Sequence, residues 1–291
     1  MGRWERSWWI TRSSFDVLMK DKEMLWFPIL SGFFSLLFSA ALLVPTFVLD
    51  LLKHTRVGGA TLGPVQIVAV FATYFGLSFI ATFFNVCVVY TTRVRLDGGD
   101  ATFGESIAFA FSRLHLIVGW SLLSASVGIL LQGIESMARR SGLIGKILLS
   151  IVRAMLAGAW SIMTVFVVPS MVYRGTGPME AIRDSFDTLK RTWGESVIGY
   201  YGVGIASFVC ALPGILLVVA GVALLAGGTA AGGTAPVAGV VALALGVLVL
   251  AAASLVFGVI STIYKTALYH FATTGQPPSG FEAASMSNAF R

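Results

Sequence analysis

Long runs without a charged residue alternate with short charged segments along this chain. The first four uncharged runs extend over residues 24–49, 65–92, 116–134 and 154–173. The fifth, residues 196–264, contains 69 residues and is long enough for two membrane crossings, because one crossing takes about 20 apolar residues in a helix. Paired glycines and Pro236 within residues 226–239 favour a turn at its centre. The pattern therefore predicts six transmembrane helices.

Three of the charged segments carry an apolar stripe with helical spacing. In residues 177–194 the stripe consists of Met179, Ile182, Phe186, Leu189 and Trp193. The corresponding stripe before the first run is Trp4, Trp8, Thr11, Phe15 and Leu18, and before the third it is Phe103, Ile107, Phe111, Leu114 and Val118. Intervals of three and four residues predict amphipathic helices. Such helices are too short and too charged to cross a membrane, so we expect them to lie in its interface.

The three stripes share a short motif, which reads SFDVL at 14–18, AFSRL at 110–114 and SFDTL at 185–189. Because each copy precedes a pair of apolar runs, the sequence predicts three parallel repeats of an interfacial amphipathic helix plus a transmembrane hairpin. The expected units are about residues 1–95, 96–174 and 175–270, followed by a cytoplasmic C-terminal tail at 271–291. The predicted fold class is an all-α, polytopic membrane helix bundle, forming a single integral membrane domain over residues 1–291.

Composition and charge agree with this class. Hydrophobic residues make up 56% of the 291 residues and charged residues 12%, whereas soluble domains contain about 25% charged residues. If the N-terminus is cytoplasmic, fourteen of the 20 Lys and Arg residues fall on the cytoplasmic side. The positive-inside rule then predicts that both termini are cytoplasmic. We interpret the net charge of +6 as an orientation signal and expect no binding to nucleic acid.

The sequence offers little catalytic chemistry. His54, His115 and His270 are far apart, and no close set of metal ligands or catalytic side chains is recognisable. We therefore expect no catalytic residue, no metal, no cofactor and no enzyme activity. An enzyme would need acids and histidines to meet at the inner face, where the candidates are Asp97, Asp100, His115 and His270.

Polar and small residues within the runs suggest packing more than chemistry. No ionisable residue is expected at the middle of a span, and Lys265, which follows the last run, is assigned to the cytoplasmic side. Small residues spaced by four, which let helices approach closely, occur at Ser124 and Gly128, Ala154 and Gly158, and Ser254 and Gly258. The DGGD sequence at 97–100 is expected to end one helix and cap the next.

Two stretches resemble a known family. They are LMKDKEMLWFPILSG at 18–32 and the tail YHFATTGQPPSGF at 269–281, followed by NAFR at 288–291. Both are similar to a family of uncharacterised prokaryotic six-span membrane proteins, a domain of unknown function that is distantly like the membrane domain of some glycerophosphodiester phosphodiesterases. The resemblance implies a six-span bundle in the plasma (inner) membrane of a prokaryote. It supplies no catalytic or binding residues.

These observations favour a multi-pass membrane protein that is a non-enzymatic scaffold or accessory subunit. Its cytoplasmic-face amphipathic helices would bind membrane lipids, a membrane protein partner or another copy of the chain. The expected contact residues are Trp4, Trp8, Phe15, Phe111, Met179, Ile182, Phe186, Leu189 and Trp193. The alternative is a transporter or channel for a lipophilic or neutral small molecule, because the spans provide an uncharged lining.

Overall fold

The computed structural model describes residues 3–53, 64–231 and 235–276. Within these ranges the chain forms helices and no strand. The helices are α1 (Arg3–Lys20), the 3₁₀ helix η1 (Lys22–Leu25), α2 (Trp26–Lys53), α3 (Pro64–Leu96), α4 (Phe103–Ser112), α5 (Leu114–Arg140), α6 (Leu143–Met163), α7 (Val167–Arg174), α8 (Pro178–Ala231) and α9 (Ala235–Thr274). Six described segments are long and apolar enough to cross a membrane. The predicted all-α membrane bundle is therefore confirmed. Most of the predicted tail, residues 277–291, lies outside the described residues.

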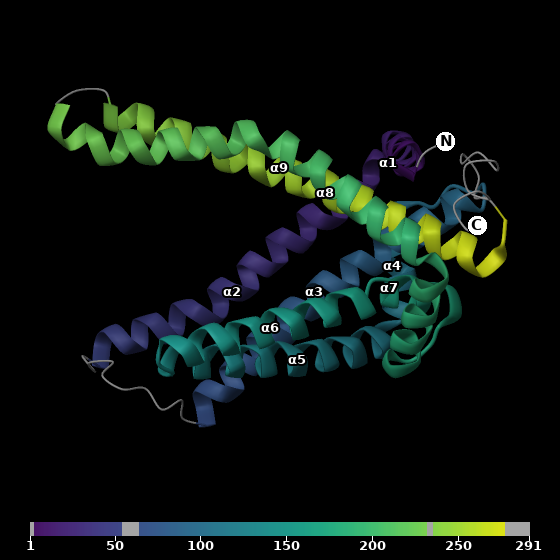
Figure 1. Ribbon diagram of the computed structural model, residues 1–291, viewed down its shortest axis with the longest axis horizontal. Coiled ribbons are helices and arrows are strands. Elements are labelled where there is room, and N and C mark those ends of the chain that lie inside the picture. Colours follow the sequence, from purple (N-terminus) through teal and green to yellow (C-terminus); the bar gives the residue numbers. More distant parts are fainter. Residues whose placement is uncertain (1–2, 54–63, 232–234, 277–291) are drawn as a thin grey trace.

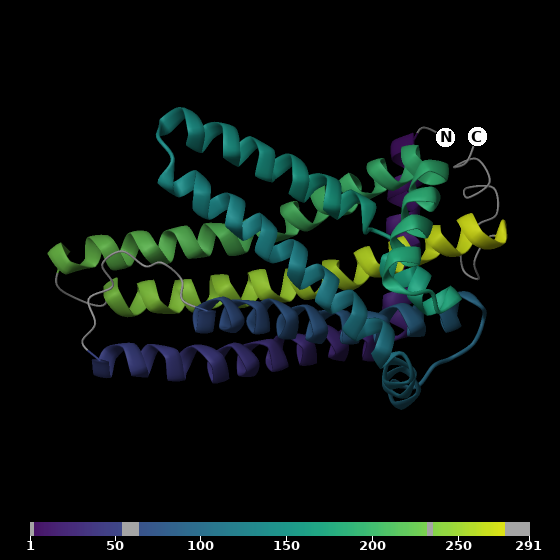
Figure 2. The same ribbon diagram turned by 90° about the horizontal axis from the view of Figure 1, so that it is seen from below.

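Three long hairpins make up most of the molecule. α2 pairs with α3, α5 with α6 and α8 with α9, and α3 also contacts α5 and α9. The hairpins meet at the end where α1, α4 and α7 lie, which we call the convergent end (Figure 1). From there the α5–α6 and α8–α9 hairpins diverge, as both Figure 1 and Figure 2 show. The predicted turn of the last hairpin falls between the end of α8 at Ala231 and the start of α9 at Ala235, and residues 232–234 lie outside the described residues.

The hydrophobic core lies at the convergent end. Its largest fully buried side chains include Met24, Phe27, Phe166, Ile263 and Tyr269, which come from η1, α2, the residues before α7, and α9. By contrast, α6 has no buried residue. It contacts α5, with the Trp160 ring stacked on that of Trp120 at 5.7 Å. The apolar side chains exposed along the spans are those that a bilayer would cover.

The third predicted amphipathic helix is not a separate element. Residues 178–194 form the first turns of α8, which continues unbroken to Ala231. Gly175, with φ 66°, ends α7 in the left-handed conformation, and Pro178 occupies the first turn of α8, where proline is favoured. No proline stands between Lys190 and Val203, and an isolated glycine costs a helix only about 1 kcal/mol. The predicted repeat of three separate interfacial helices is therefore not confirmed.

Span four is bent. α6 ends at Met163 and α7 begins at Val167. At the break, the Phe166 N–H donates a hydrogen bond of 3.0 Å to the Ser185 hydroxyl of α8. A backbone N–H that loses its helical partner inside an apolar bundle needs another acceptor, and Ser185 provides it.

α8 and α9 approach each other most closely at glycines. A Cβ added to Gly221 would lie 2.7 Å from the backbone nitrogen of Leu243, and one added to Gly246 would lie 2.7 Å from that of Val218. Gly214 and Gly239 would likewise meet backbone atoms of the facing helix, each at 3.1 Å. Glycines seven residues apart on each helix therefore bring the two backbones together.

The small-residue pairs predicted from the sequence contribute less to the close approach of helices. A Cβ on Gly158 or on Gly258 would meet nothing within 4 Å. At Gly128 it would touch the Tyr74 ring at 3.0 Å, so this glycine does let α5 approach α3. The close approaches were missed because spacing alone does not show which helix face meets a neighbour.

The DGGD turn ends α3 as predicted. Gly98 has φ 85°, and the Gly99 N–H donates to the Val94 carbonyl at 2.8 Å, as in a Schellman cap. The next helix is capped differently from the prediction. Thr102 and Glu105 form a reciprocal capping box at the start of α4, and Asp100 pairs with Arg95.

Candidate functional site

The SFDVL, AFSRL and SFDTL segments share one orientation. Their first residues, Ser14, Ala110 and Ser185, are fully buried. The phenylalanines that follow, Phe15, Phe111 and Phe186, expose 43%, 58% and 40% of their surfaces. Small residues let membrane helices pack closely, so each segment packs its small residue against the bundle and leaves its phenylalanine partly exposed. The Phe111 ring also meets the Phe83 ring of α3 edge-on, with the ring centres 5.1 Å apart.

The other predicted contact residues divide between surface and core. Met179 is exposed, Ile182 is half-buried against the core, and Leu189 is buried within it. α1 and α8 also contain Trp4, Trp8 and Trp193, whose side chains lie outside the described residues. The accessible predicted contacts of the described part are therefore Met179 and the three phenylalanines.

The elements that carry the exposed phenylalanines lie at one end of the molecule. α1 runs across the long axis of the bundle at the convergent end, and α4 also lies crosswise there (Figure 2). If the hairpins cross a membrane along their length, α1 and α4 lie along its surface. Bases accompany the aromatic residues: the Lys190 amine lies 4.2 Å from the Phe186 ring centre, and the Arg113 guanidinium 5.4 Å from that of Phe109.

Arg95, near the end of α3, holds together three parts of the convergent end. Its Nε and Nη2 donate to the two Asp21 carboxylate oxygens at 2.6 and 2.5 Å, and its Nη2 also donates to Asp100 at 2.6 Å. Asp21 connects α1 to η1, and Asp100 precedes α4. The Arg95 and Asp21 side chains are only 24% and 12% exposed, so this two-pronged pair is largely shielded from water.

A second polar cluster joins α3, α7 and α9. The Tyr173 hydroxyl lies 3.3 Å from His270 Nδ1, and Asp97 Oδ1 lies 3.7 Å from the same nitrogen. The Arg93 guanidinium stands over the Tyr173 ring at 4.7 Å and donates to the Val172 carbonyl at 3.1 Å. Two of the four enzyme candidates, Asp97 and His270, thus meet. Asp100 instead pairs with Arg95, and His115 is exposed on α5.

Asp184 joins the ends of α7, α8 and α9. It accepts a hydrogen bond from the Tyr269 hydroxyl and pairs with Arg174 at 2.6 Å. In these clusters each carboxylate therefore faces a base or a phenol from another element. This pairing suits the joining of helix ends. Among the described residues, no group of three or more His, Cys, Asp and Glu side chains could hold a metal ion, and His54 lies outside them.

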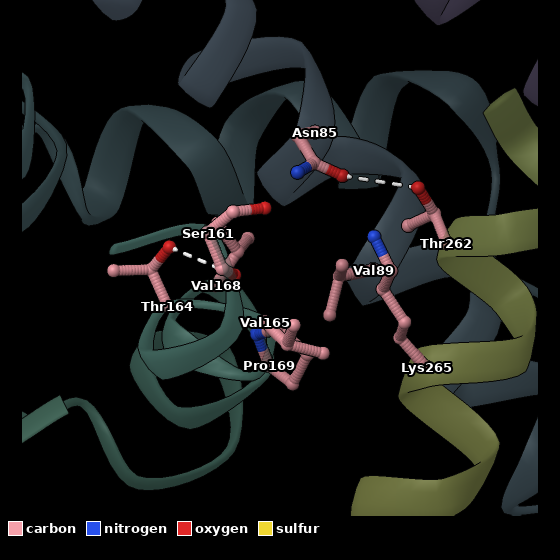
Figure 3. Close-up of a pocket in the computed structure, with 9 residues that line it drawn as sticks. All are labelled: Asn85, Val89, Ser161, Thr164, Val165, Val168, Pro169, Thr262 and Lys265. Carbon is pink, nitrogen blue, oxygen red and sulfur yellow. Dashed lines mark hydrogen bonds between the residues drawn. The ribbon is translucent and has the colours of Figure 1, made fainter. Parts of the chain in front are cut away.

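A polar cavity lies deeper in the bundle, where α3, α6, α7 and α9 meet. Its volume is about 200 Å³. The lining residues are Asn85, Val89, Ser161, Thr164, Val165, Val168, Pro169, Thr262 and Lys265 (Figure 3). The Thr262 hydroxyl donates to the Asn85 amide oxygen at 3.4 Å, and Figure 3 shows the Lys265 amine extending from α9 into the space beside them.

Lys265 lies inside the last helix and lines the cavity, not at the cytoplasmic end of the span as the sequence predicts. The uncharged run ends at Tyr264, but α9 continues to Thr274 and is followed by Gly275 with φ 68°. At 1.5 Å per residue, Lys265 lies roughly 14 Å from the end of the helix. The signal that could have found this site was the stop sequence GQPP, because glycine and proline, not charge, end the helix.

The chain was compared with known proteins. No curated protein and no solved structure gives a significant match, and the expected distant likeness to the membrane domain of glycerophosphodiester phosphodiesterases is not shown. Residues 64–281 match the model of a protein family described as a family of unknown function, DUF6159. This range covers well over half of the chain, from α3 to beyond the end of α9. The chain therefore belongs to the DUF6159 family.

Proposed function

We infer that the protein is a non-enzymatic scaffold or accessory subunit whose helices at the convergent end bind membrane lipids or a membrane protein partner, which can be a second copy of the chain. The observation that supports this role is the exposure of Phe15, Phe111 and Phe186 beside three buried small residues. An amphipathic helix binds at the membrane–water boundary through an apolar face, on which Phe is common.

The neighbouring charges fit the same role. Arg12, Lys20, Arg183 and Lys190 are exposed on α1 and α8. A base near an anionic membrane surface adds about 1 kcal/mol of attraction. The convergent end is therefore proposed to be the cytoplasmic face of the plasma (inner) membrane of a prokaryote, with both termini cytoplasmic and no binding to nucleic acid.

Spin labels can test this contact in the full-length protein. In a Cys210→Ser background, Phe111→Cys and Ser112→Cys carry the label on neighbouring residues, both exposed on α4. We expect the label at 111 to be accessible to oxygen and protected from a water-soluble nickel chelate. At 112 we expect the reverse. Low accessibility of position 111 to both reagents would indicate a protein contact, whereas water-like behaviour at 111 would contradict the proposal.

A transporter or channel for a lipophilic or neutral small molecule is the second candidate. A further cavity of about 210 Å³ lies between α2, α3 and α9. Asn85 and Thr262 line both this cavity and the cavity of Figure 3, and their 3.4 Å hydrogen bond is long and therefore weak. If the two cavities form one path for a neutral solute, proteoliposomes should take up glycerol faster than empty liposomes. Asn85→Trp should slow the uptake. Equal rates with and without protein would contradict this function.

A further inference from the structure

Lys265 places a base inside the bundle. It lies in α9 on the N-terminal side of Tyr269 and His270, which belong to the polar clusters of the convergent end. The side chains of an α-helix lean toward its N-terminus. For α9 this direction leads away from His270 and Thr274 and toward Thr262, which agrees with the amine position in Figure 3. A lysine that reached for the membrane surface would extend the other way. The Lys265 amine therefore lies in the cavity and does not extend to the membrane surface.

The groups around Lys265 are suited to an anion. The Lys265 ammonium can donate three hydrogen bonds and the Asn85 amide two. Figure 3 shows the Asn85 oxygen directed to Thr262 and its nitrogen on the side of Ser161, so the amide donor faces the cavity. The Ser161 hydroxyl of α6 extends toward the same space (Figure 3), whereas the Thr164 hydroxyl donates to the Trp160 and Ser161 carbonyls at 2.8 and 3.4 Å. Lys265 is the one charged residue among those that line the cavity in the described chain.

The remaining walls and the size of the cavity narrow the class of ligand. Val89, Val165, Val168 and Pro169 form apolar walls. A volume of about 200 Å³ is smaller than the 300–1,000 Å³ typical of pockets that enclose whole drug-sized molecules. It suits a small charged group attached to a longer apolar part. Beyond the cavity, α6 and α9 diverge (Figure 1) and expose apolar side chains such as Met155 and Val247.

We propose that this cavity binds the oxyanion headgroup, a carboxylate or a phosphate, of an acidic lipid. Lys265 supplies the charge, Asn85 and the Ser161 hydroxyl orient the oxygens, and the apolar chain leaves between α6 and α9. The site is separate from Phe15, Phe111 and Phe186, so it does not depend on the function proposed for the convergent end. Hydrogen bonds between charged groups are roughly twice as strong as neutral ones, so Lys265 should dominate the affinity.

Native mass spectrometry of the full-length protein in lipid nanodiscs tests the site. The nanodiscs would contain phosphatidylcholine with equal small amounts of palmitate and phosphatidic acid. We expect the wild-type protein to retain one acidic lipid in preference to phosphatidylcholine. Lys265→Met should reduce this retention by about tenfold or more, whereas Lys265→Arg should keep part of it. Lys146→Met, which removes an exposed lysine from α6, is the matched control and should leave retention unchanged.

The outcomes separate the possible sources of the anion. Retention of palmitate alone identifies a carboxylate, and retention of phosphatidic acid alone identifies a phosphate; either supports the site. If inorganic phosphate or acetate protects the protein against heat as well as the lipids do, and no lipid is retained, the lipid assignment is overturned. Equal retention by wild type and Lys265→Met would also overturn it. If Lys265→Met does not fold, Asn85→Leu provides the second test. It leaves the base in place and should also lower retention of the acidic lipid.

Discussion

Ser185 and Phe186 are neighbours in the chain but lie in opposite environments. Ser185 is fully buried and accepts the Phe166 N–H, while Phe186 is exposed beside the Lys190 amine. In water the aromatic residue would be the one to turn inward. Within a bilayer the lipid is as apolar as the protein interior, so large apolar residues can face outward, and small residues face the neighbouring helix. An apolar stripe on a membrane-surface helix can therefore mark the side that faces lipid as well as the side that packs against protein.

Arg95 is expected to stabilise the convergent end through its pairing with Asp21. Arg95→Met should lower the stability of the protein by about 2–3 kcal/mol, because it leaves the shielded Asp21 carboxylate without its two charged hydrogen bonds. Lys190→Met is the matched control. It removes a base from the exposed pair with Asp187 and should change stability by less than about 1 kcal/mol. The midpoint of thermal unfolding in detergent measures both, and equal midpoints would contradict the role of Arg95.

The sequence predicts the positions of the helices better than it predicts their ends. The five apolar runs correctly locate six spans, and the DGGD stretch correctly marks the end of α3. Charged residues do not mark the ends of the helices. The charged residues 178–194 continue into α8, and Lys265 lies inside α9. A helix ends where the backbone loses its hydrogen bonding, at proline or left-handed glycine, whereas a charged side chain can continue the helix.

The candidate sites were less predictable than the spans. Asp97 and His270 are far apart in the sequence, and only the packing of α3 against α9 brings them together. The same holds for Asn85 and Thr262, whose contact defines the cavity. Their partners lie on different helices, and hydrophobic periodicity identifies an apolar face without showing which helix covers it.

The glycine contact between α8 and α9 is expected to stabilise the hairpin. Gly221→Ala should destabilise the hairpin by about 1–3 kcal/mol, because overpacking forces the backbones apart where a Cβ would lie 2.7 Å from the Leu243 nitrogen. Gly204→Ala, in the same helix, meets nothing within 4 Å and should be neutral or slightly stabilising, since alanine favours helix. Thermal unfolding in detergent compares the two substitutions. A Gly221→Ala protein as stable as Gly204→Ala would show that the close approach is not needed.

At the scale of the molecule, the convergent end combines the core, the ion pairs and the exposed phenylalanines, while the far ends of the hairpins diverge (Figure 1). This asymmetry gives the two membrane faces different properties. The charged network joins α1, α3, α4, α7, α8 and α9 at one level. Opening between the hairpins is therefore expected to start at the far ends, where α8 and α9 contact mainly each other.

The orientation of the whole molecule is the remaining prediction. If the convergent end faces the cytoplasm, Ser112 lies inside the cell, and Gly142, in the turn between α5 and α6, lies outside. Both positions are exposed. In a Cys210→Ser background, in which Cys87 is buried, a membrane-impermeant maleimide added to intact cells should label Gly142→Cys and leave Ser112→Cys unlabelled. Both should react once the membrane is disrupted, which controls for accessibility. Labelling of Ser112→Cys alone in intact cells would reverse the orientation, and would place the basic surface of α1 and α8 on the outer face, against the direction in which Lys and Arg orient membrane proteins.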